Sequence, residues 1–347
     1  MSHRLYQSLN SSLRLEYDGA VHSVYREDNL KAGIDIRYEK KIPTGMLTLS
    51  YAFNWQRQIR ASSPVVIPIF NEDHLLADGK ITLLSKPYAD LATVVVKDVT
   101  GTIIYQPNFD YLLMERNNYL EIQRVPGGQI PNNTAVYIDY YSMLPGSYQY
   151  DVNFHSFNAD IILFGRIVEL YFRFGNQDYH NLKTAEYLTL NYLNQKIYGC
   201  RLEYKFASGG VEYETYASSI IPYRMFRYYA QLQGTFRNKL SFAMNGNIRR
   251  YRMLYEASNQ TYIDITGKIG YMFTSQTNLS FEAGYRKQVG QGIDLDLLTA
   301  RGEFTTVFRQ IMIKVGVEMY QRDYLQENTG LMGGYIRIVR SFNWVKR

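Results

Sequence analysis

Few side chains in this sequence are grouped in a way that supports catalysis. Asp178 and His180, within GNQDYHN, have the composition of a carboxylate–imidazole pair that could act as general acid and base. Such a pair needs a nucleophile or an activated water beside it, and the sequence identifies no residue for that role. Asp294 and Asp296, within GQGIDLDLL, lie in a predicted long loop and could hold a cation, although paired acidic residues in a loop are more often simply solvated.

The other chemical motifs point away from an enzyme. The five histidines are scattered without a close pair, so we predict no metal site. The sequence has no nucleophile-elbow motif, no P-loop and no dinucleotide-binding fingerprint. Cys200 is the only cysteine, and therefore no intrachain disulfide can form. We predict a protein that is not an enzyme and that uses no cofactor.

The basic charge balance does not by itself indicate a nucleic-acid partner. The net charge is +6 and the isoelectric point is near 9.0, but the basic residues are spread along the chain. The densest group, Arg249 to Arg252, lies near the end of a predicted strand. Aromatic residues alternate with arginine in YRMFRYYAQL, which suits base stacking but equally suits the wall of a barrel. We predict no nucleic-acid partner.

The dominant pattern is an alternation of apolar and polar residues with a period of two. In TNLSFEAGYRKQ, Leu279, Phe281 and Tyr285 alternate with polar or small residues, which predicts a strand with two unlike faces. Comparable segments fill the chain from about residue 184 to the end and also occur before residue 60. The predicted strands lie at about 5–17, 31–41, 45–57, 147–157, 160–174, 187–206, 209–218, 224–236, 239–254, 261–273, 277–288, 297–308, 311–322 and 330–342.

The links between these strands alternate in length. Short links such as IPTG, ASGG and RNK are followed by longer polar ones, as in an up-and-down meander with tight turns at one end and long loops at the other. By this parity both termini fall on the short-turn side. Residues 58–146 interrupt this alternation of long strands and links with short strand-like runs such as VVIPIF and AVYIDYYS. They predict a small immunoglobulin-like β-sandwich of about seven strands, inserted at a long-loop position.

Charged residues of both signs occupy the polar faces of the predicted strands. A wet lumen accommodates them, whereas placing Arg or Lys at the bilayer midplane costs about 2–4 kcal/mol. Aromatic residues at the ends of the apolar faces, such as Trp55 and Phe273, suit a membrane interface. A soluble sandwich or propeller would instead bury the apolar face, but strands of 12 or more residues are long for such folds. The predicted lumen-lining residues are Asp35, Arg37, Arg201, Glu203, Arg227, Arg249, Asp264, Lys268, Glu282, Arg286, Arg301, Glu303, Lys314, Glu318 and Arg337.

The hydropathy of the chain excludes helical membrane spans only. No stretch approaches about 18 consecutive apolar residues, and the mean hydropathy is −0.30, but a transmembrane strand needs only about 9–11 residues. The beginning of the sequence, MSHRLYQSLNSSLRLEYD, has no apolar signal-peptide core. We therefore expect either a cytoplasmic chain or one whose export signal lies upstream.

The alternating strands, with short and long links in turn and the ending GGYIRIVRSFNW, resemble those of a bacterial outer-membrane β-barrel. Such barrels often end on a strand with a terminal aromatic residue. Here Phe342 and Trp344 are followed by three further residues, which departs from that pattern. Residues 101–141 are similar to β modules of bacterial surface proteins. The resemblance implies an antiparallel transmembrane barrel of about fourteen strands, formed by residues 1–57 and 147–347, with residues 58–146 outside a Gram-negative cell.

This resemblance implies a channel or an export or uptake pore whose inserted domain serves gating or binding. The implied partners are outer-membrane lipid, a small solute or an exported chain, and further subunits. Mixed lumen charges predict little ion selectivity, with a slight preference for anions. The alternative is a surface binding or anchoring protein in which the barrel is only a membrane mount. A soluble all-β surface protein is a third interpretation.

Overall fold

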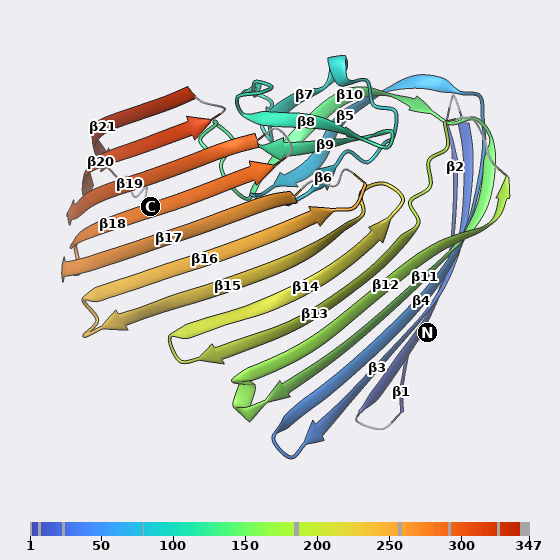
Figure 1. The fold of residues 1–347 in the computed structure, drawn as a ribbon, viewed down its shortest axis with the longest axis horizontal. Helices are drawn as coiled ribbons and strands as arrows, with labels where there is room; N and C mark the ends of the chain where they lie inside the picture. The colour runs from blue at the N-terminus through green and yellow to red at the C-terminus, as the bar shows by residue number, and fades with distance from the viewer. Residues whose placement is uncertain are drawn as a thin grey trace, which may run out of the picture. The chain divides into compact units, whose positions relative to one another are not determined.

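The computed structural model describes residues 2–5, 8–22, 25–78, 80–183, 187–255, 259–290, 293–324 and 327–340. Across these residues the chain is all-β, and its strands pair antiparallel, as the alternation predicted (Figure 1). The only helical segments in these ranges are two 3-10 turns, Leu91–Thr93 and Phe164–Arg166. The described part of the chain contains no helix that is long and apolar enough to span a membrane.

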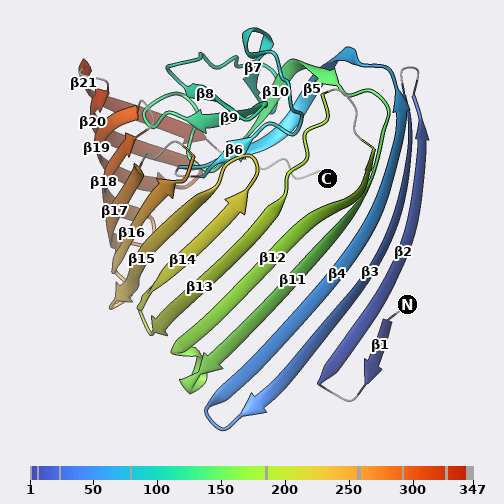
Figure 2. The ribbon, with the colours of Figure 1, turned by 45° about the vertical axis from the view of Figure 1, so that its right-hand side comes forward.

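Fifteen strands form one large sheet. They are hydrogen-bonded in chain order, except that β11 pairs with β4 because β5 to β10 form two other sheets. In Figure 2, β11 accordingly lies between β4 and β12. The strands are β1 (Ser2–Leu5), β2 (Leu9–Val21), β3 (Tyr25–Ile42), β4 (Gly45–Ser62), β11 (Tyr148–Leu163), β12 (Val168–Lys183), β13 (Leu193–Tyr204), β14 (Ala207–Ser218), β15 (Tyr223–Phe236), β16 (Leu240–Met253), β17 (Asn259–Thr274), β18 (Thr277–Gly290), β19 (Ile293–Phe308), β20 (Ile311–Tyr324) and β21 (Glu327–Arg340).

The predicted fourteen strands correspond to these elements without β1, but some predicted ends were wrong. A turn was predicted near residues 157–160, whereas β11 continues to Leu163 and the turn lies at 164–167. A long link was predicted at 174–187, whereas β12 extends to Lys183. Its last residues are polar on both faces, so the alternation that identifies a strand from sequence is lost although the strand continues.

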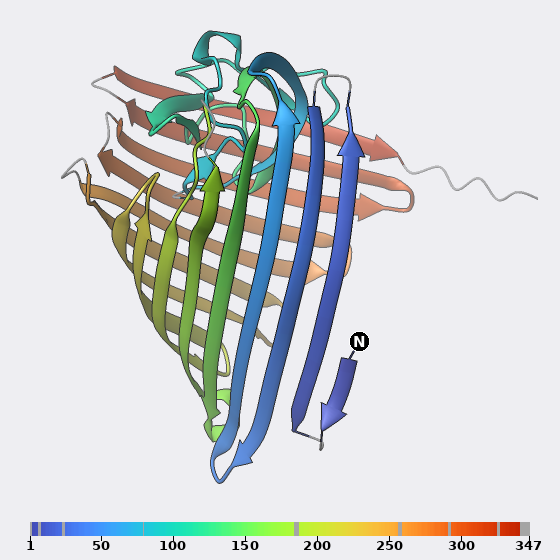
Figure 3. The same cartoon turned by 90° about the vertical axis from the view of Figure 1, so that its right-hand side faces the viewer.

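The chain forms two compact units. Unit 1 comprises Met1–Cys200, Glu212–Met225 and Arg252–Ala257, and unit 2 comprises Arg201–Val211, Phe226–Tyr251 and Ser258–Arg347. In unit 1, β2, β3 and β4 run side by side (Figure 3). Gly45 begins β4 at the short turn, where an added Cβ would lie 1.7 Å from the Ile162 carbonyl oxygen. Only glycine therefore permits this close approach between β4 and β11.

Residues 63–147, the inserted segment, form two three-stranded sheets, ordered β5-β10-β7 and β6-β9-β8. The strands are β5 (Val65–Leu76), β6 (Thr82–Leu83), β7 (Val95–Asp98), β8 (Tyr111–Arg116), β9 (Tyr119–Arg124) and β10 (Thr134–Leu144). Both sheets contribute to one buried core, which includes Val96, Val136 and Ile138 from the first sheet and Leu120 and Ile122 from the second. Six strands are present in the described part of this segment, where about seven were predicted.

Edge strand β5 carries two features that oppose further strand pairing. Pro68 has no backbone N–H to donate. Three residues later the register against β10 shifts, where Asn71 has a φ of 54°. Proline and bulges of this kind are common protections of an exposed sheet edge. The inserted segment is therefore built to remain a separate pair of small sheets.

Candidate functional site

Unit 1 has a polar groove on one face of the large sheet. Ser12, Asp35, Ala52, Ser156 and Gly175 stand directly opposite one another on β2, β3, β4, β11 and β12. Residues directly opposite one another project from the same face of an antiparallel sheet. Gly175 has no side chain, and the other four residues have short side chains and border a cavity of about 520 Å³. We call this feature the polar groove.

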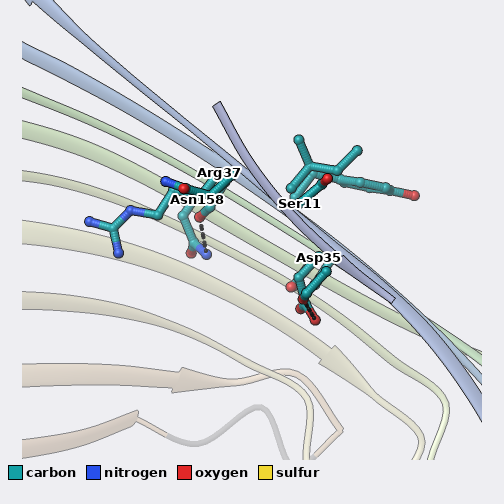
Figure 4. A pocket seen from close by; sticks show the side chains of 11 residues that line it. Ser11, Asp35, Arg37 and Asn158 are labelled. Carbon is teal, nitrogen blue, oxygen red and sulfur yellow. Dashed lines mark hydrogen bonds between the residues drawn. The ribbon is translucent and has the colours of Figure 1, made fainter. Parts of the chain in front are cut away.

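The next row of residues supplies longer polar side chains to the same groove. Asn10, Arg37, Ser50 and Asn158 stand opposite one another on β2, β3, β4 and β11. Figure 4 shows Asp35, Arg37 and Asn158 projecting from one side of the sheet and Ser11 from the other. This arrangement follows from the two-residue period, because Ser11 lies between Asn10 and Ser12 in sequence.

Hydrogen bonds within the groove fix several of these groups. The Ser12 hydroxyl donates to the Asp35 carboxylate at 3.2 Å, and the Asn158 amide donates to the Ser50 hydroxyl at 3.2 Å. The Arg37 guanidinium lies 2.7 Å from the Glu39 carboxylate two residues along β3. The positive charge of the groove is therefore balanced within its own strand.

Unit 2 carries a row of charges that alternate in sign. Lys268 stands opposite Glu282, Glu282 opposite Arg301, and Arg301 opposite Glu318, on the consecutive strands β17 to β20. We call these four residues the charge ladder. The Lys268 ammonium lies 3.8 Å from Glu282, and both side chains are more than half exposed. Each charge has an opposite neighbour, so the ladder presents little net charge.

A second cluster on the same face centres on Glu303. Its carboxylate accepts hydrogen bonds from Lys314 at 2.9 Å, Arg301 at 2.9 Å and the Tyr335 hydroxyl at 2.6 Å. Arg337 stands opposite Lys314 and so shares this face. Near the other ends of β17 and β18, Arg286 donates to Asp264 at 2.6 Å. Together with the ladder, these contacts bring nine of the predicted lumen-lining residues onto one face of β17–β21.

The remaining predicted lumen-lining residues fall into smaller groups. Asp35 and Arg37 border the polar groove. Arg201 donates to Glu203 at 2.9 Å from the same face of β13. Arg227 donates to Asn247 at 3.2 Å, and Arg249 lies two residues along β16 from that asparagine. The structure pairs these residues locally, while their position in a lumen stays a prediction.

Asp294 and Asp296 were predicted in a long loop, and this was wrong because both belong to β19. Asp296 accepts hydrogen bonds from the Tyr285 hydroxyl at 2.6 Å and from Lys287 at 2.9 Å. The intervening Leu295 is fully buried on the opposite face. In the described residues, no group of three or more His, Cys, Asp or Glu side chains is placed to hold a metal ion.

Asp178 and His180 also lie in a strand, β12, where they share a face two residues apart. The Asp178 carboxylate accepts a hydrogen bond from Asn176. His180 stands opposite Asp151, whose carboxylate accepts two hydrogen bonds from Arg57, at 2.7 and 2.8 Å, and one from Asn181 at 2.6 Å. These carboxylates are therefore engaged in structural hydrogen bonds.

Sequence reasoning missed the contacts between the inserted segment and two links of the large sheet in unit 1. Asn117, at the β8–β9 turn, donates to the Ser219 carbonyl oxygen at 2.7 Å. The Tyr88 ring packs edge to face on Tyr187, with 5.3 Å between centroids. Ile220, next to Ser219, is 5% exposed. No local pattern predicts these contacts, because the residues that meet are about 100 positions apart.

Comparisons with known proteins give no family for this chain. No family model and no curated protein sequence matches it. Among solved structures, the chain is similar to the "Usher PapC translocation pore", with 10% sequence identity over 98% of each chain and a TM-score of 0.15.

Proposed function

We propose that this chain is an outer-membrane β-barrel that forms a channel, with the inserted segment outside the cell controlling access to it. The observation that carries this proposal is the unequal charge of the two faces of β17–β21. Nine charged residues share one face of β17–β21, while Ile313, Val315 and Val317 line the other face of β20. A wet lumen and a lipid exterior together account for these two unlike faces.

Closure of the sheet into a barrel requires its two ends to pair. The large sheet without β1 has fourteen strands, an even number as in bacterial outer-membrane barrels, and β2 and β21 have similar lengths of 13 and 14 residues. Within the described residues, β21 has one strand partner, and β2 pairs with β1 only over Leu9–Ser12. A closed barrel has no exposed sheet edge, so the proposed function requires that these edges be paired.

The apolar face of the terminal strands has the exposure that a lipid contact requires. Leu15 is 73% exposed and Ile336 is 72% exposed. Burying such side chains in hydrocarbon stabilises a barrel by roughly 25 cal/mol per Å² of apolar surface removed from water. A soluble protein would leave this surface in water, so lipid is the partner that its chemistry favours.

Conductance in planar lipid bilayers tests the channel proposal. The purified full chain, inserted from detergent, should produce discrete current steps, and it should show heat-dependent mobility on gels as a folded barrel does. Folded protein that inserts into the bilayer without producing steps would exclude a channel. That result would favour the alternative function, in which the barrel only anchors a binding domain at the surface.

The charge ladder yields a selectivity prediction. Replacing Glu282 and Glu318 together with glutamine removes the carboxylate opposite Lys268 and both carboxylates opposite Arg301, which keeps only its ion pair with Glu303. We expect the reversal potential under a KCl gradient to shift toward anion selectivity, because the channel wall gains net positive charge. Replacing Glu115, an exposed residue of β8, with glutamine serves as the control and should leave the reversal potential unchanged. An unchanged potential in the double variant would contradict a position of the ladder beside the ion path.

A further inference from the structure

The polar groove has a composition that suits a particular class of ligand. Its short row consists of Ser12, Asp35, Ala52 and Ser156, and the adjacent row adds Asn10, Ser50 and Asn158. Hydroxyl and amide groups both donate and accept hydrogen bonds, so they can match a partner that presents many hydroxyl groups. A simple inorganic ion does not need hydrogen-bond donors and acceptors together at closely spaced positions.

The charges of the groove do not favour an ionic ligand. The Arg37 guanidinium is paired with Glu39 at 2.7 Å. Asp35 is the one acidic residue among the described residues that border the cavity, and its carboxylate already accepts a hydrogen bond from the Ser12 hydroxyl. An ionised carboxylate that accepts hydrogen bonds from neutral hydroxyl groups binds them more strongly than a neutral acceptor does. Asp35 therefore suits a neutral hydroxyl-bearing ligand better than an anion.

The shape of the groove favours an elongated ligand. The cavity of about 520 Å³ is bordered by four neighbouring strands, β2, β3, β4 and β11. Adjacent strands lie about 4.8 Å apart, so the small-residue row extends roughly 14 Å across these strands. The volume lies within the range of about 300–1,000 Å³ that is typical of small-molecule sites. Because the side chains of Ala52 and Ser156 are short, they leave space above the sheet in which a chain of linked sugar rings can lie across the strands.

We propose that the polar groove is a binding site for a neutral, polyhydroxylated solute, and specifically for a linear oligosaccharide. The proposal deepens the proposed channel function, because a site on the lumen wall would contact the solute during passage. Binding itself does not require conduction, so the two can be tested separately.

The experiment measures binding to the full folded chain in detergent. A linear glucose hexasaccharide serves as the probe, and saturation-transfer NMR titration gives the dissociation constant. In the variant carrying Asn158→Leu and Ser156→Leu, we expect affinity to fall roughly tenfold, because two hydrogen-bonding side chains are lost and the floor is raised. Phe157→Leu, which alters the opposite face of the same strand, should leave the affinity unchanged.

The outcomes separate the two proposals. Saturable binding that the double variant weakens and the control preserves supports the oligosaccharide site. Absence of binding to the folded wild-type chain overturns it, as does binding that the double variant leaves intact. Bilayer conductance of the same preparation reports on the channel alone. If the protein conducts but does not bind the hexasaccharide, the channel proposal is supported and the oligosaccharide site is excluded. If it binds the hexasaccharide but does not conduct, the oligosaccharide site is supported and the channel is excluded.

Discussion

Deletion of residues 64–146 is expected to raise single-channel conductance several-fold. The inserted segment is held against links of the large sheet in unit 1 by the Asn117–Ser219 hydrogen bond and by the Tyr88–Tyr187 ring contact. Under the proposed function, the inserted segment restricts access to the channel. Its removal should therefore increase the ion flux at a given voltage, which single-channel recording measures directly.

The geometry of the junction makes this deletion feasible. The Ser62 backbone N–H donates to the Ser147 hydroxyl at 3.0 Å, and that hydroxyl donates back to the Ser62 carbonyl oxygen at 3.0 Å. Strand β4 also pairs with β11 from Arg60 and Tyr148 onward. The chain therefore leaves and re-enters the large sheet at adjacent points, and a short glycine–serine turn can join them without altering the strand register.

A milder variant provides the matched comparison. Asn117→Ala with Tyr88→Ala removes the two side-chain contacts but keeps the inserted segment, so we expect more frequent opening with an unchanged maximal conductance. Val99→Ala, at an exposed position of the same segment, is the control. If the deletion protein conducts no better than the full chain, the inserted segment does not restrict the channel, and a binding role becomes the better explanation for it.

A second large effect is expected from acidification of the inserted segment. The Glu72 carboxylate accepts hydrogen bonds from the Ser85 backbone N–H at 2.8 Å and from the Tyr140 hydroxyl at 2.6 Å, and it also contacts the Ser85 hydroxyl and His74. Burial opposes ionisation of this carboxylate, but the hydrogen bonds outweigh burial and lower its pKa from 4.5 to about 2.

The direction of the pH dependence follows from this pKa. A carboxyl whose pKa is lower in the folded state stabilises the fold above its unfolded pKa near 4.5. That contribution, about 3 kcal/mol, is lost as the pH falls from roughly 5 to 2. Because the intrinsic rate of amide exchange itself falls with pH, the measured quantity is the protection factor, and the protection factors of peptides from β5 and β10 in the full chain should decrease over this range.

The Glu72→Gln variant isolates the contribution of the carboxylate. At neutral pH its β5 and β10 amides should have lower protection factors than those of the wild type, and the further loss of protection on acidification should be much smaller. Asp73→Asn is the control, because Asp73 is the exposed neighbour of Glu72 on β5. A Glu72→Gln chain with the same acid profile as the wild type would show that other carboxylates cause the loss of protection.

Much of the strand content could be predicted from local sequence. The period of two located β15, β16 and β18 to within two residues of their observed ends. The same period assigned Asp35 and Arg37 to one face, because alternate side chains of a strand must point to opposite sides. Prediction failed where polar residues occupy both faces, as at the end of β12, and where acidic residues interrupt an apolar run, as at Asp294 and Asp296.

Sequence patterns alone determined that the protein is all-β, and they assigned most residues of its long strands to a mainly apolar or a mainly charged face. The tertiary structure decided which residues stand opposite one another. Glu282 meets Arg301, and Ser12, Asp35, Ala52 and Ser156 form a single row, only because of the register between strands. A shift of one residue would move every side chain to the other face, and local periodicity cannot specify that register. The contact of Asn117 with Ser219 likewise depends on chain segments that meet only in the folded protein.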